Sequence, residues 1–287
     1  MTGTLYVIGV GPGDPELLTL KAVRILRDIS CLCVPKGREE GSSLALSIVK
    51  KAVNIDGKEI IEAHFPMRKT KKQDTGYRIQ DTAPPTQPSP SPCAVNSTTT
   101  RGERGEGKGG SKGLGSGFRT LDSDLCELDT KWNETVQTVL SRLNRGIDMA
   151  FITIGDPTIY STFFYLYDKL LELNPELSIE IIPGVSSINT AAARAGLSLG
   201  LADEKIAILP ATYMDDLKET LKKFDTVVLM KVHGVFNSVR NILNDMNLAD
   251  NAVYISRAGM DDEKIFRDIK NIKLEDLNYF SLLIIKK

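Results

Sequence analysis

Residues 4–28 read TLYVIGVGPGDPELLTLKAVRILRD: an apolar run, a glycine-rich loop and an amphipathic segment follow one another. The unbroken apolar run that ends at Gly9 predicts a buried β-strand. Asp14 followed by Pro15 is typical of a helix N-cap with proline at the first helical position. The stretch therefore predicts a strand, a loop and a helix, with Leu17, Leu18, Ala22, Ile25 and Leu26 on the apolar face of the helix.

The rest of the chain repeats this alternation, which is typical of α/β proteins whose sheets are covered on both faces. A natural partition is two α/β domains, residues 1–146 and 147–287, joined near residues 146–150 where Gly146 closes a predicted helix. We expect strands at 29–35, 59–67, 149–155, 179–184, 205–210, 226–231, 252–256 and 281–287, and helices at 42–53, 131–146, 158–173, 186–196, 214–224 and 235–246.

The composition excludes several classes of protein. The 287 residues include 36 basic and 37 acidic side chains, so the net charge of −1 provides no positive field for nucleic acid or an anionic membrane. No apolar run reaches eighteen residues and no basic leader opens the chain, so we expect a cytoplasmic protein without a membrane span. The four cysteines lack the paired spacing of a zinc site, which favours spectator thiols over metal ligands: Cys31, Cys33, Cys93 and Cys126.

A low-complexity segment interrupts the first domain at about residues 73–125. Five prolines between 84 and 92 precede eight glycines between 102 and 117, and almost no large apolar side chains accompany them. Such a composition predicts a disordered insertion, because it cannot bury enough surface to offset the entropy of ordering. The alternative of a basic nucleic-acid tether is disfavoured because Glu103 and Glu106 interrupt the positive charge.

The glycine loop at residues 9–13 superficially resembles a dinucleotide-binding fingerprint. The spacing differs, because the third glycine follows the second by two residues, and Pro12 removes an amide where a pyrophosphate needs a donor. No acidic residue ends the second predicted strand either. A different ligand-binding glycine loop is therefore favoured over a nucleotide site or a purely structural turn.

Four further loops follow predicted strands, where α/β proteins bind ligands. They are residues 154–157 (IGDP), 183–187 (PGVSS), 230–231 (MK) and 257–260 (RAGM). Asp156 has an alternative interpretation as a simple helix N-cap. Each loop alone is a weak signal, but their order along the chain is informative.

In this order, GVGPGDPELLTLKA, GDP with a tyrosine three residues later, PGVSS and LMK resemble the tetrapyrrole methylases. The fuller strings FPM (65–67), TIGDPTIYST (153–162) and EIIPGVSSINTAAARAGLSL (180–199) are similar to members that methylate carbon 20 of precorrin-2 or its cobalt complex. The resemblance implies two α/β domains with mixed sheets and an interdomain cleft, a homodimer, S-adenosylmethionine as cofactor and a tetrapyrrole substrate. The low-complexity segment departs from the family pattern.

The resemblance also implies a set of cofactor contacts, many of them through backbone groups. Asp156 is the one charged group expected among them, near the amino or ribose groups of the cofactor. The positions that match the family motifs are Pro12, Gly155, Asp156, Ile159, Ser186, Ser187, Met230 and Gly259.

Methyl transfer from a sulfonium is an in-line displacement, so catalysis depends mainly on positioning and on the exclusion of water, and neither a metal nor a nucleophilic side chain is needed. A general base could still remove a proton from the ring system; the weak candidates are Tyr160, His64 and His233. Lys36, Arg68, Lys231 and Arg257 are candidates to meet substrate carboxylates.

Three alternatives remain open at this stage. The chain could methylate another ring carbon, it could be a methyltransferase of the same fold that acts on ribosomal RNA or diphthamide, or it could bind the cofactor without turnover.

Overall fold

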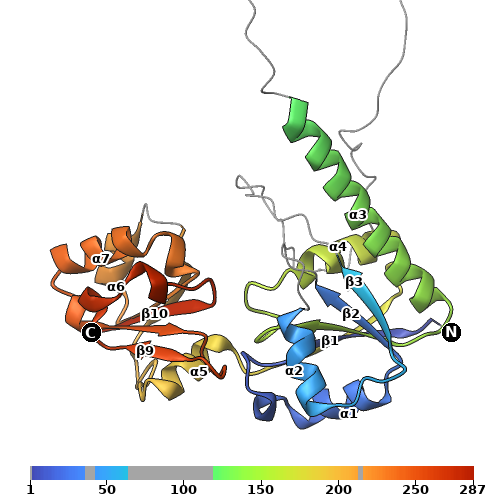
Figure 1. Ribbon diagram of the computed structural model, residues 1–287, viewed down its shortest axis with the longest axis horizontal. Coiled ribbons are helices and arrows are strands. Elements are labelled where there is room, and N and C mark those ends of the chain that lie inside the picture. Colours follow the sequence, from blue (N-terminus) through green and yellow to red (C-terminus); the bar gives the residue numbers. More distant parts are fainter. Residues whose placement is uncertain (1, 36–42, 64–118, 213–215) are drawn as a thin grey trace, which may run out of the picture. The chain divides into compact units, whose positions relative to one another are not determined.

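The computed structural model describes residues 2–35, 43–63, 119–212 and 216–287 (Figure 1). Within these ranges ten β-strands form two sheets of five strands each, and α-helices cover the sheets. Both sheets lie in one compact unit. The observed architecture confirms the predicted α/β fold class.

The first sheet is parallel throughout, and helices pack on both of its faces. Ile8 and Ile152 face a cluster that includes α1 (Leu20–Asp28) and α2 (Leu44–Ala52). Leu5 and Phe151 face the opposite cluster, with α3 (Arg119–Asn144) and α4 (Phe163–Leu173). In spatial order the strands are β3 (Glu59–Ala63), β2 (Cys31–Pro35), β4 (Met149–Thr153), β1 (Thr4–Gly9) and β5 (Ser178–Ile182).

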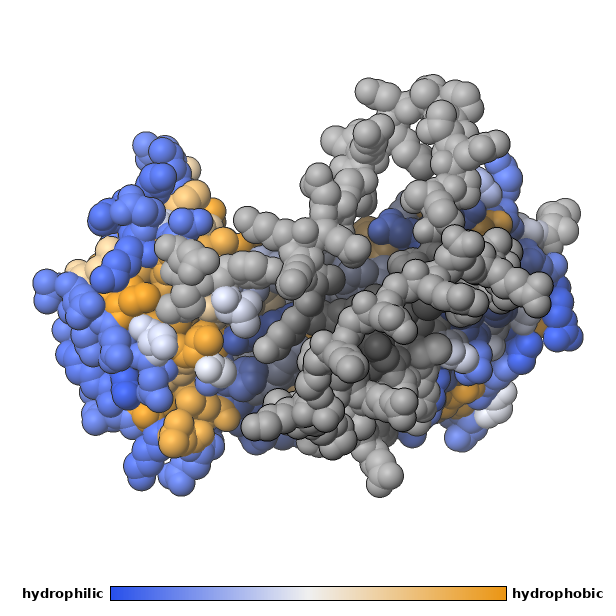
Figure 2. Space-filling view, turned by 90° about the horizontal axis from the view of Figure 1, so that it is seen from above, coloured by the Kyte–Doolittle hydropathy of each residue, from blue (hydrophilic) through white to orange (hydrophobic). Residues whose placement is uncertain are grey.

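The second sheet is mixed, because only β6 and β7 run parallel to each other. Its face that carries Leu229, Tyr254 and Leu283 packs on α6 (Leu217–Lys223) and α7 (Phe236–Asp245). The other face packs on α5 (Ser187–Arg194). In spatial order the strands are β6 (Ile206–Pro210), β7 (Thr226–Met230), β10 (Ser281–Lys286), β8 (Ala252–Ser256) and β9 (Lys264–Phe266). Some hydrophobic side chains reach the surface over this part of the molecule (Figure 2).

The topology corrects the expected boundary near residues 146–150. Gly146, with φ of 78°, does follow the end of α3, as predicted. However, β4 and β5 come after this point and pair with β1 on its two sides, so the first sheet extends to Ile182. Apolar patterning could not reveal this, because the pairing partners of a buried strand are set by crossover connections and not by its own sequence.

Two predicted helices begin later than the sequence suggests. Asp14 caps a short 3-10 helix, η1 (Pro15–Leu17), and α1 begins at Leu20 after Thr19, whose side chain accepts a hydrogen bond from the Ala22 amide at 3.2 Å. The helix expected from residue 158 begins at Phe163, because Tyr160 has a φ of 51° that no right-handed helix accommodates. The short strand β9 was not predicted.

Most of the predicted low-complexity insertion lies outside the described residues. The predicted end of the insertion, at about residue 125, is wrong, because residues 119–125 belong to α3. Among the helices that the structure describes, none combines the length and apolar character needed to cross a membrane.

Candidate active site

Three glycines bring the loops after β4, β1 and β5 into backbone contact. A Cβ atom at Gly9 would lie 2.6 Å from the carbonyl oxygen of Gly155 and 2.7 Å from the amide nitrogen of Gly184. A Cβ atom at Gly184 would lie 2.4 Å from the same Gly155 oxygen. These strands are neighbours in a parallel sheet, so their carboxyl ends meet at one edge. Only glycine allows the three backbones to approach this closely.

The glycine loop is tied directly to the loop after β4. The Gly155 amide donates to the Gly11 carbonyl at 2.8 Å, and the Gly11 amide donates to the Gly155 carbonyl at 3.4 Å. Both glycines have positive φ, 76° at Gly11 and 71° at Gly155, which side chains with a Cβ rarely adopt. The loops that follow β1 and β4 therefore form one backbone-bonded platform.

Asp156 joins this platform to the loop after β5. Its Oδ1 accepts hydrogen bonds from the amide of Thr158, at 2.8 Å, and from the Thr158 hydroxyl. Its Oδ2 accepts from the Gly184 amide at 3.0 Å. The interpretation of Asp156 as the N-cap of α4 is wrong, because that helix begins seven residues later, at Phe163. The carboxylate instead bridges two loops and stays half-buried.

A pocket of about 460 Å³ opens beside this carboxylate. This size is within the range of small-molecule sites. Its wall combines apolar surfaces with hydroxyl, amide and carboxylate groups, so it could hold an amphipathic ligand with several hydrogen-bonding groups. The lining residues are Thr19, Asp156, Thr158, Ile159, Pro183, Gly184, Val185, Ser186 and Asn189.

Ser186 reaches the pocket from the start of α5. Its side chain accepts a hydrogen bond from the Asn189 amide at 3.3 Å and so caps the helix, as the predicted helix start requires. Ser186 therefore marks the N-terminal end of α5, where a helix has free amides and a partial positive charge. Ser187, the first residue of α5, does not line the pocket.

Pro12 and Gly259 lie against each other although 247 positions separate them in the sequence numbering. A Cβ atom at Gly259 would lie 3.2 Å from Cγ of Pro12 and 3.3 Å from Cγ2 of Thr190 in α5. Next to this contact, a Cβ atom at Gly13 would lie 2.8 Å from the Gly259 carbonyl oxygen. The glycine loop thus meets the loop after β8, and φ of 77° at Gly259 permits the approach.

Two other predicted contact residues share one hydrophobic cluster. Ile159 and Met230 both pack against the apolar cluster between α5 and the second sheet, and both are half-buried. Of the eight predicted cofactor positions, Asp156, Ile159 and Ser186 line the pocket, whereas Pro12, Gly155, Ser187, Met230 and Gly259 do not.

The candidate bases lie in different surroundings. The Tyr160 hydroxyl donates to the Ile208 carbonyl at 3.3 Å, and partial burial raises the pKa of this phenol above its ordinary value. His233 follows β7 in the 3-10 helix η2 (Val232–Gly234), edge-on to the Tyr279 ring with 5.4 Å between centroids. Its Nδ1 is buried and has no hydrogen-bond partner in the described part of the chain. His64 lies outside the described residues.

The candidate cations differ in whether their side chains are paired. Nε of Arg257 pairs with Oδ1 of Asp262 at 2.5 Å, whereas Lys231 has no ion pair or hydrogen bond of its side chain within the described ranges. Both residues directly follow a strand and have positive φ, 54° and 57°. Lys36 and Arg68 lie outside the described residues.

Several residues that line the pocket were not predicted from the sequence. Pro183, Gly184 and Val185 stood within a loop already singled out, and Thr158 directly follows the GDP string, so position in the motif could have found them. Thr19 carries only the signal of a helix cap, and Asn189 looks like an ordinary helical position, so only the fold brings them to the pocket. Within the described ranges, no group of three His, Cys, Asp or Glu side chains could hold a metal ion.

The sheet order, the glycine platform and the pocket together define a protein with an α/β ligand site built from strand-end loops. The chain belongs to the family Tetrapyrrole (Corrin/Porphyrin) Methylases, whose family model matches residues 4–272.

Its curated relatives include two proteins of similar length. The cobalt-precorrin-2 C(20)-methyltransferase of Salmonella typhimurium is 28% identical over 100% of this chain and 98% of its own. The probable cobalt-precorrin-2 C(20)-methyltransferase of Methanocaldococcus jannaschii is 31% identical over 99% of this chain and 96% of its own.

Solved structures share the fold. A cobalt precorrin-4 methyltransferase superposes with a TM-score of 0.62 at 19% identity, covering 99% of this chain and 94% of the other. A uroporphyrin-III C-methyl transferase from Thermus thermophilus, complexed with S-adenyl homocysteine, gives a TM-score of 0.58 at 16% identity over 99% of this chain and 92% of the other.

Proposed function

We propose that this protein transfers a methyl group from S-adenosylmethionine to carbon 20 of precorrin-2 or of its cobalt complex, a step of corrin-ring synthesis. The observation that carries the proposal is the pocket beside Asp156, built by the same GDP and PGVSS loops that the family resemblance assigns to the cofactor. Full-length relatives named for this reaction support the choice of ring carbon.

The residues of the pocket fit the cofactor in chemical character. Ile159, Pro183 and Val185 offer apolar surface for an aromatic ring, and the hydroxyl and amide groups of the wall offer hydrogen bonds for hydroxyl, amino and carboxylate groups. When bound, S-adenosylmethionine supplies a methyl carbon made electrophilic by its positively charged sulfur. Pro12, Gly155, Ser187, Met230 and Gly259 complete the proposed contact set.

The contribution of the chain to catalysis is positioning. The loops around the pocket are fixed to one another by backbone and carboxylate hydrogen bonds, so the reacting groups can be aligned without further ordering of these loops. Ile159 at the pocket wall and Met230 in the same apolar cluster give this side of the proposed site an apolar surface, which disfavours water where charge is lost from sulfur. Tyr160 is not proposed as a general base, because its hydroxyl donates a hydrogen bond to the Ile208 carbonyl and partial burial raises the pKa of the phenol.

Of the two candidate cations within the described residues, Lys231 better suits a carboxylate of the substrate. It directly follows Met230, and its ammonium group has no partner within the described ranges. Arg257 is less suited, because Asp262 already neutralises it. A cytoplasmic homodimer is also part of the proposal and rests on the family resemblance; sedimentation velocity of the purified chain tests the assembly.

The decisive experiment locates the new methyl group. The purified protein is incubated anaerobically with precorrin-2, or with its cobalt complex, and S-adenosylmethionine labelled with ¹³C in the methyl group, and the product is examined by NMR. Labelling at carbon 20 is the expected result. Labelling at another ring carbon contradicts the assignment within the family, and labelling of RNA or protein with no labelled tetrapyrrole contradicts the substrate class.

A further inference from the structure

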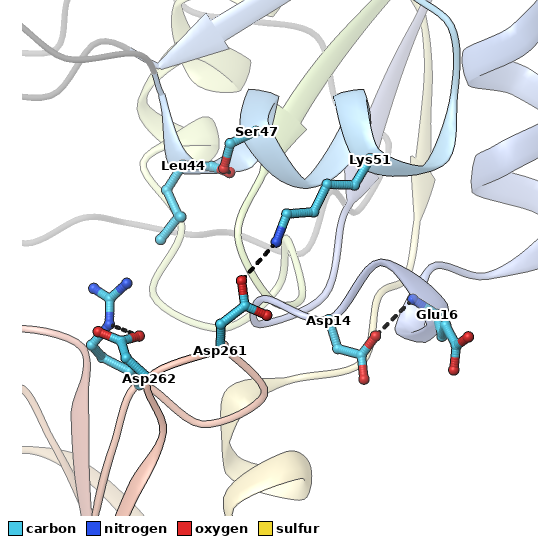
Figure 3. A network of polar contacts seen from close by, with 8 residues as sticks. Asp14, Glu16, Leu44, Ser47, Lys51, Asp261 and Asp262 are labelled. Carbon is cyan, nitrogen blue, oxygen red and sulfur yellow. Dashed lines mark hydrogen bonds and ion pairs between the residues drawn. The ribbon is translucent and has the colours of Figure 1, made fainter.

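Three consecutive acidic residues after β8 each pair with a cation from a different part of the fold. Figure 3 shows the side chain of Asp261 paired with that of Lys51 in α2; Oδ2 of Asp261 lies 3.1 Å from Nζ of Lys51. Asp262 pairs with Arg257 at the end of β8, and Oε2 of Glu263 lies 3.6 Å from Nε of Arg194 in the last turn of α5. These three residues, called here the acidic triplet, add ion pairs to the backbone hydrogen bonds that the loop makes within the described residues.

Glu263 also fixes the conformation of Gly259. Its Oε2 accepts a hydrogen bond from the Gly259 amide at 2.7 Å, in a short charge-assisted contact. Gly259 needs its positive φ of 77° to approach Pro12, so the carboxylate stabilises the backbone geometry on which this contact depends. The Glu263 side chain is only 20% exposed, so solvent competes weakly for it.

Arg194 connects this loop to the glycine loop. Its Nη2 lies 3.6 Å from Oδ2 of Asp14, while its Nε faces Glu263. One guanidinium thus lies between two carboxylates that belong to the two loops meeting at Pro12 and Gly259. Arg194 is also the last residue of α5, where a positive charge is favoured by the helix dipole, and the other end of the same helix carries Ser186 in the pocket.

These ion pairs are weak, which suits a role in positioning the two loops better than a role in stabilising the fold. The Arg194 side chain is 49% exposed and its two pairs are long, so each adds little to folding and both are screened by salt. What they do is hold two irregular loops at a fixed separation. The loss of such a contact affects whatever binds between or on the loops more than it affects the global fold.

We propose that Arg194 is a positioning residue for cofactor binding, which together with Asp14 and Glu263 forms a salt-sensitive clasp between the glycine loop and the loop after β8. The inference rests on the proposed function, because it assumes that Pro12 and Gly259 contact S-adenosylmethionine. The clasp makes cofactor affinity depend on ionic strength, although none of its three charged residues lines the pocket.

The test compares cofactor affinity with turnover in Arg194→Gln. Titration calorimetry with S-adenosylhomocysteine is expected to show a dissociation constant raised about threefold to tenfold at low salt, because two exposed ion pairs are lost. We expect kcat at saturating cofactor to stay within about twofold and the difference in affinity to shrink as sodium chloride is raised. Hydrogen exchange of the free protein is expected to show a faster Gly259 amide. Arg194→Lys restores part of the affinity.

Two further variants separate this role from general destabilisation. Lys218→Gln removes a pair of the same 3.6 Å length with Asp245, far from both loops in sequence, and is expected to leave affinity unchanged. Asp14→Asn keeps the Oδ1 atom that caps Glu16 but loses the charge, and is expected to reproduce the effect of Arg194→Gln without adding to it in the double variant.

The outcomes distinguish the two proposals. If the unmodified protein does not bind S-adenosylhomocysteine, the proposed function is wrong. If the unmodified protein binds S-adenosylhomocysteine, and Arg194→Gln and Asp14→Asn bind it equally well with the same salt dependence, the proposed role of the clasp is wrong. The proposed function is then unaffected. A fall in kcat with unchanged affinity also contradicts the clasp.

Discussion

The Asp156 carboxylate accepts a hydrogen bond from the Gly184 amide at 3.0 Å, which ties the loop after β4 to the loop after β5. β1 lies between these two strands, so the bond spans the strand that carries the glycine loop. The same carboxylate orders Thr158 through its other oxygen. Asp156 therefore lines the pocket and also holds two other lining residues, Thr158 and Gly184, in place through its hydrogen bonds.

Asp156→Ala is expected to weaken cofactor binding while the protein stays folded. The substitution leaves the Gly184 and Thr158 amides without their acceptor, at a cost of about 1–3 kcal/mol, or roughly fivefold to 150-fold in affinity if the loops separate. Calorimetric titration with S-adenosylhomocysteine measures the change. Asp250→Ala, which removes an 85% exposed carboxylate paired with Lys270, is the control. Unchanged affinity in a folded Asp156→Ala protein removes this residue from the site.

Gly184→Ala is expected to destabilise the protein. The new methyl group would lie 2.4 Å from the Gly155 carbonyl oxygen and 2.7 Å from the Gly9 backbone, and backbone atoms cannot move aside as a side chain can. Overpacking of this kind typically costs about 1–3 kcal/mol. Urea denaturation measures the free energy of unfolding. Gly234→Ala is the matched control, because a Cβ atom there meets nothing within 4 Å; equal stability of the two variants would contradict the glycine platform.

Tyr160→Phe is expected to keep kcat within about threefold, since it removes one hydrogen bond of 3.3 Å to a backbone carbonyl. Burial raises the pKa of the phenol, so the neutral form persists to higher pH than for an ordinary tyrosine. The alkaline side of the pH profile of kcat should therefore be the same in the unmodified protein and in Tyr160→Phe. A loss of activity by two orders of magnitude, together with the loss of such a limb, would identify Tyr160 as an acid or base.

Cys31 and Cys33 are expected to resist alkylation in the folded protein. Burial and the neighbouring Glu59 raise the pKa of Cys31 to about 11, and burial raises that of Cys33 to about 12. Iodoacetamide reacts with the thiolate, which at pH 8 is roughly a thousandth of Cys31 and less of Cys33. Peptide mass spectrometry follows each thiol separately, with unfolding in guanidinium as the positive control. Rapid labelling of either thiol under native conditions contradicts the burial of β2.

Much of the fold was accessible from local patterning. The apolar runs and the helical spacing located every strand of the first sheet and four of the five in the second, and the glycine and GDP strings marked loops that do meet. The three-residue β9 is too short to carry a periodic signal. The start of α4 was missed because Tyr160 adopts a positive φ, which no propensity of tyrosine encodes.

The candidate site was predicted less completely. Asp156, Ile159 and Ser186 were expected at a ligand site and line the pocket, but the partners that hold Asp156 in place were not foreseeable. Thr19 and Asn189 carry ordinary capping and helical signals, and the pairing of Arg194 with Asp14 joins residues 180 positions apart in the numbering. Contacts of this kind depend on which strands are neighbours.

The sequence by itself determined an α/β protein with glycine-rich loops at the ends of buried strands and a near-neutral charge, because periodicity, glycine and charge act locally or as sums over the chain. Only the tertiary structure decided that β4 and β5 flank β1, that three glycine backbones come into contact, and that Arg194 lies between two loops. The physical reason is that strand order is set by crossover connections and packing between distant segments, to which no single stretch of sequence commits the chain.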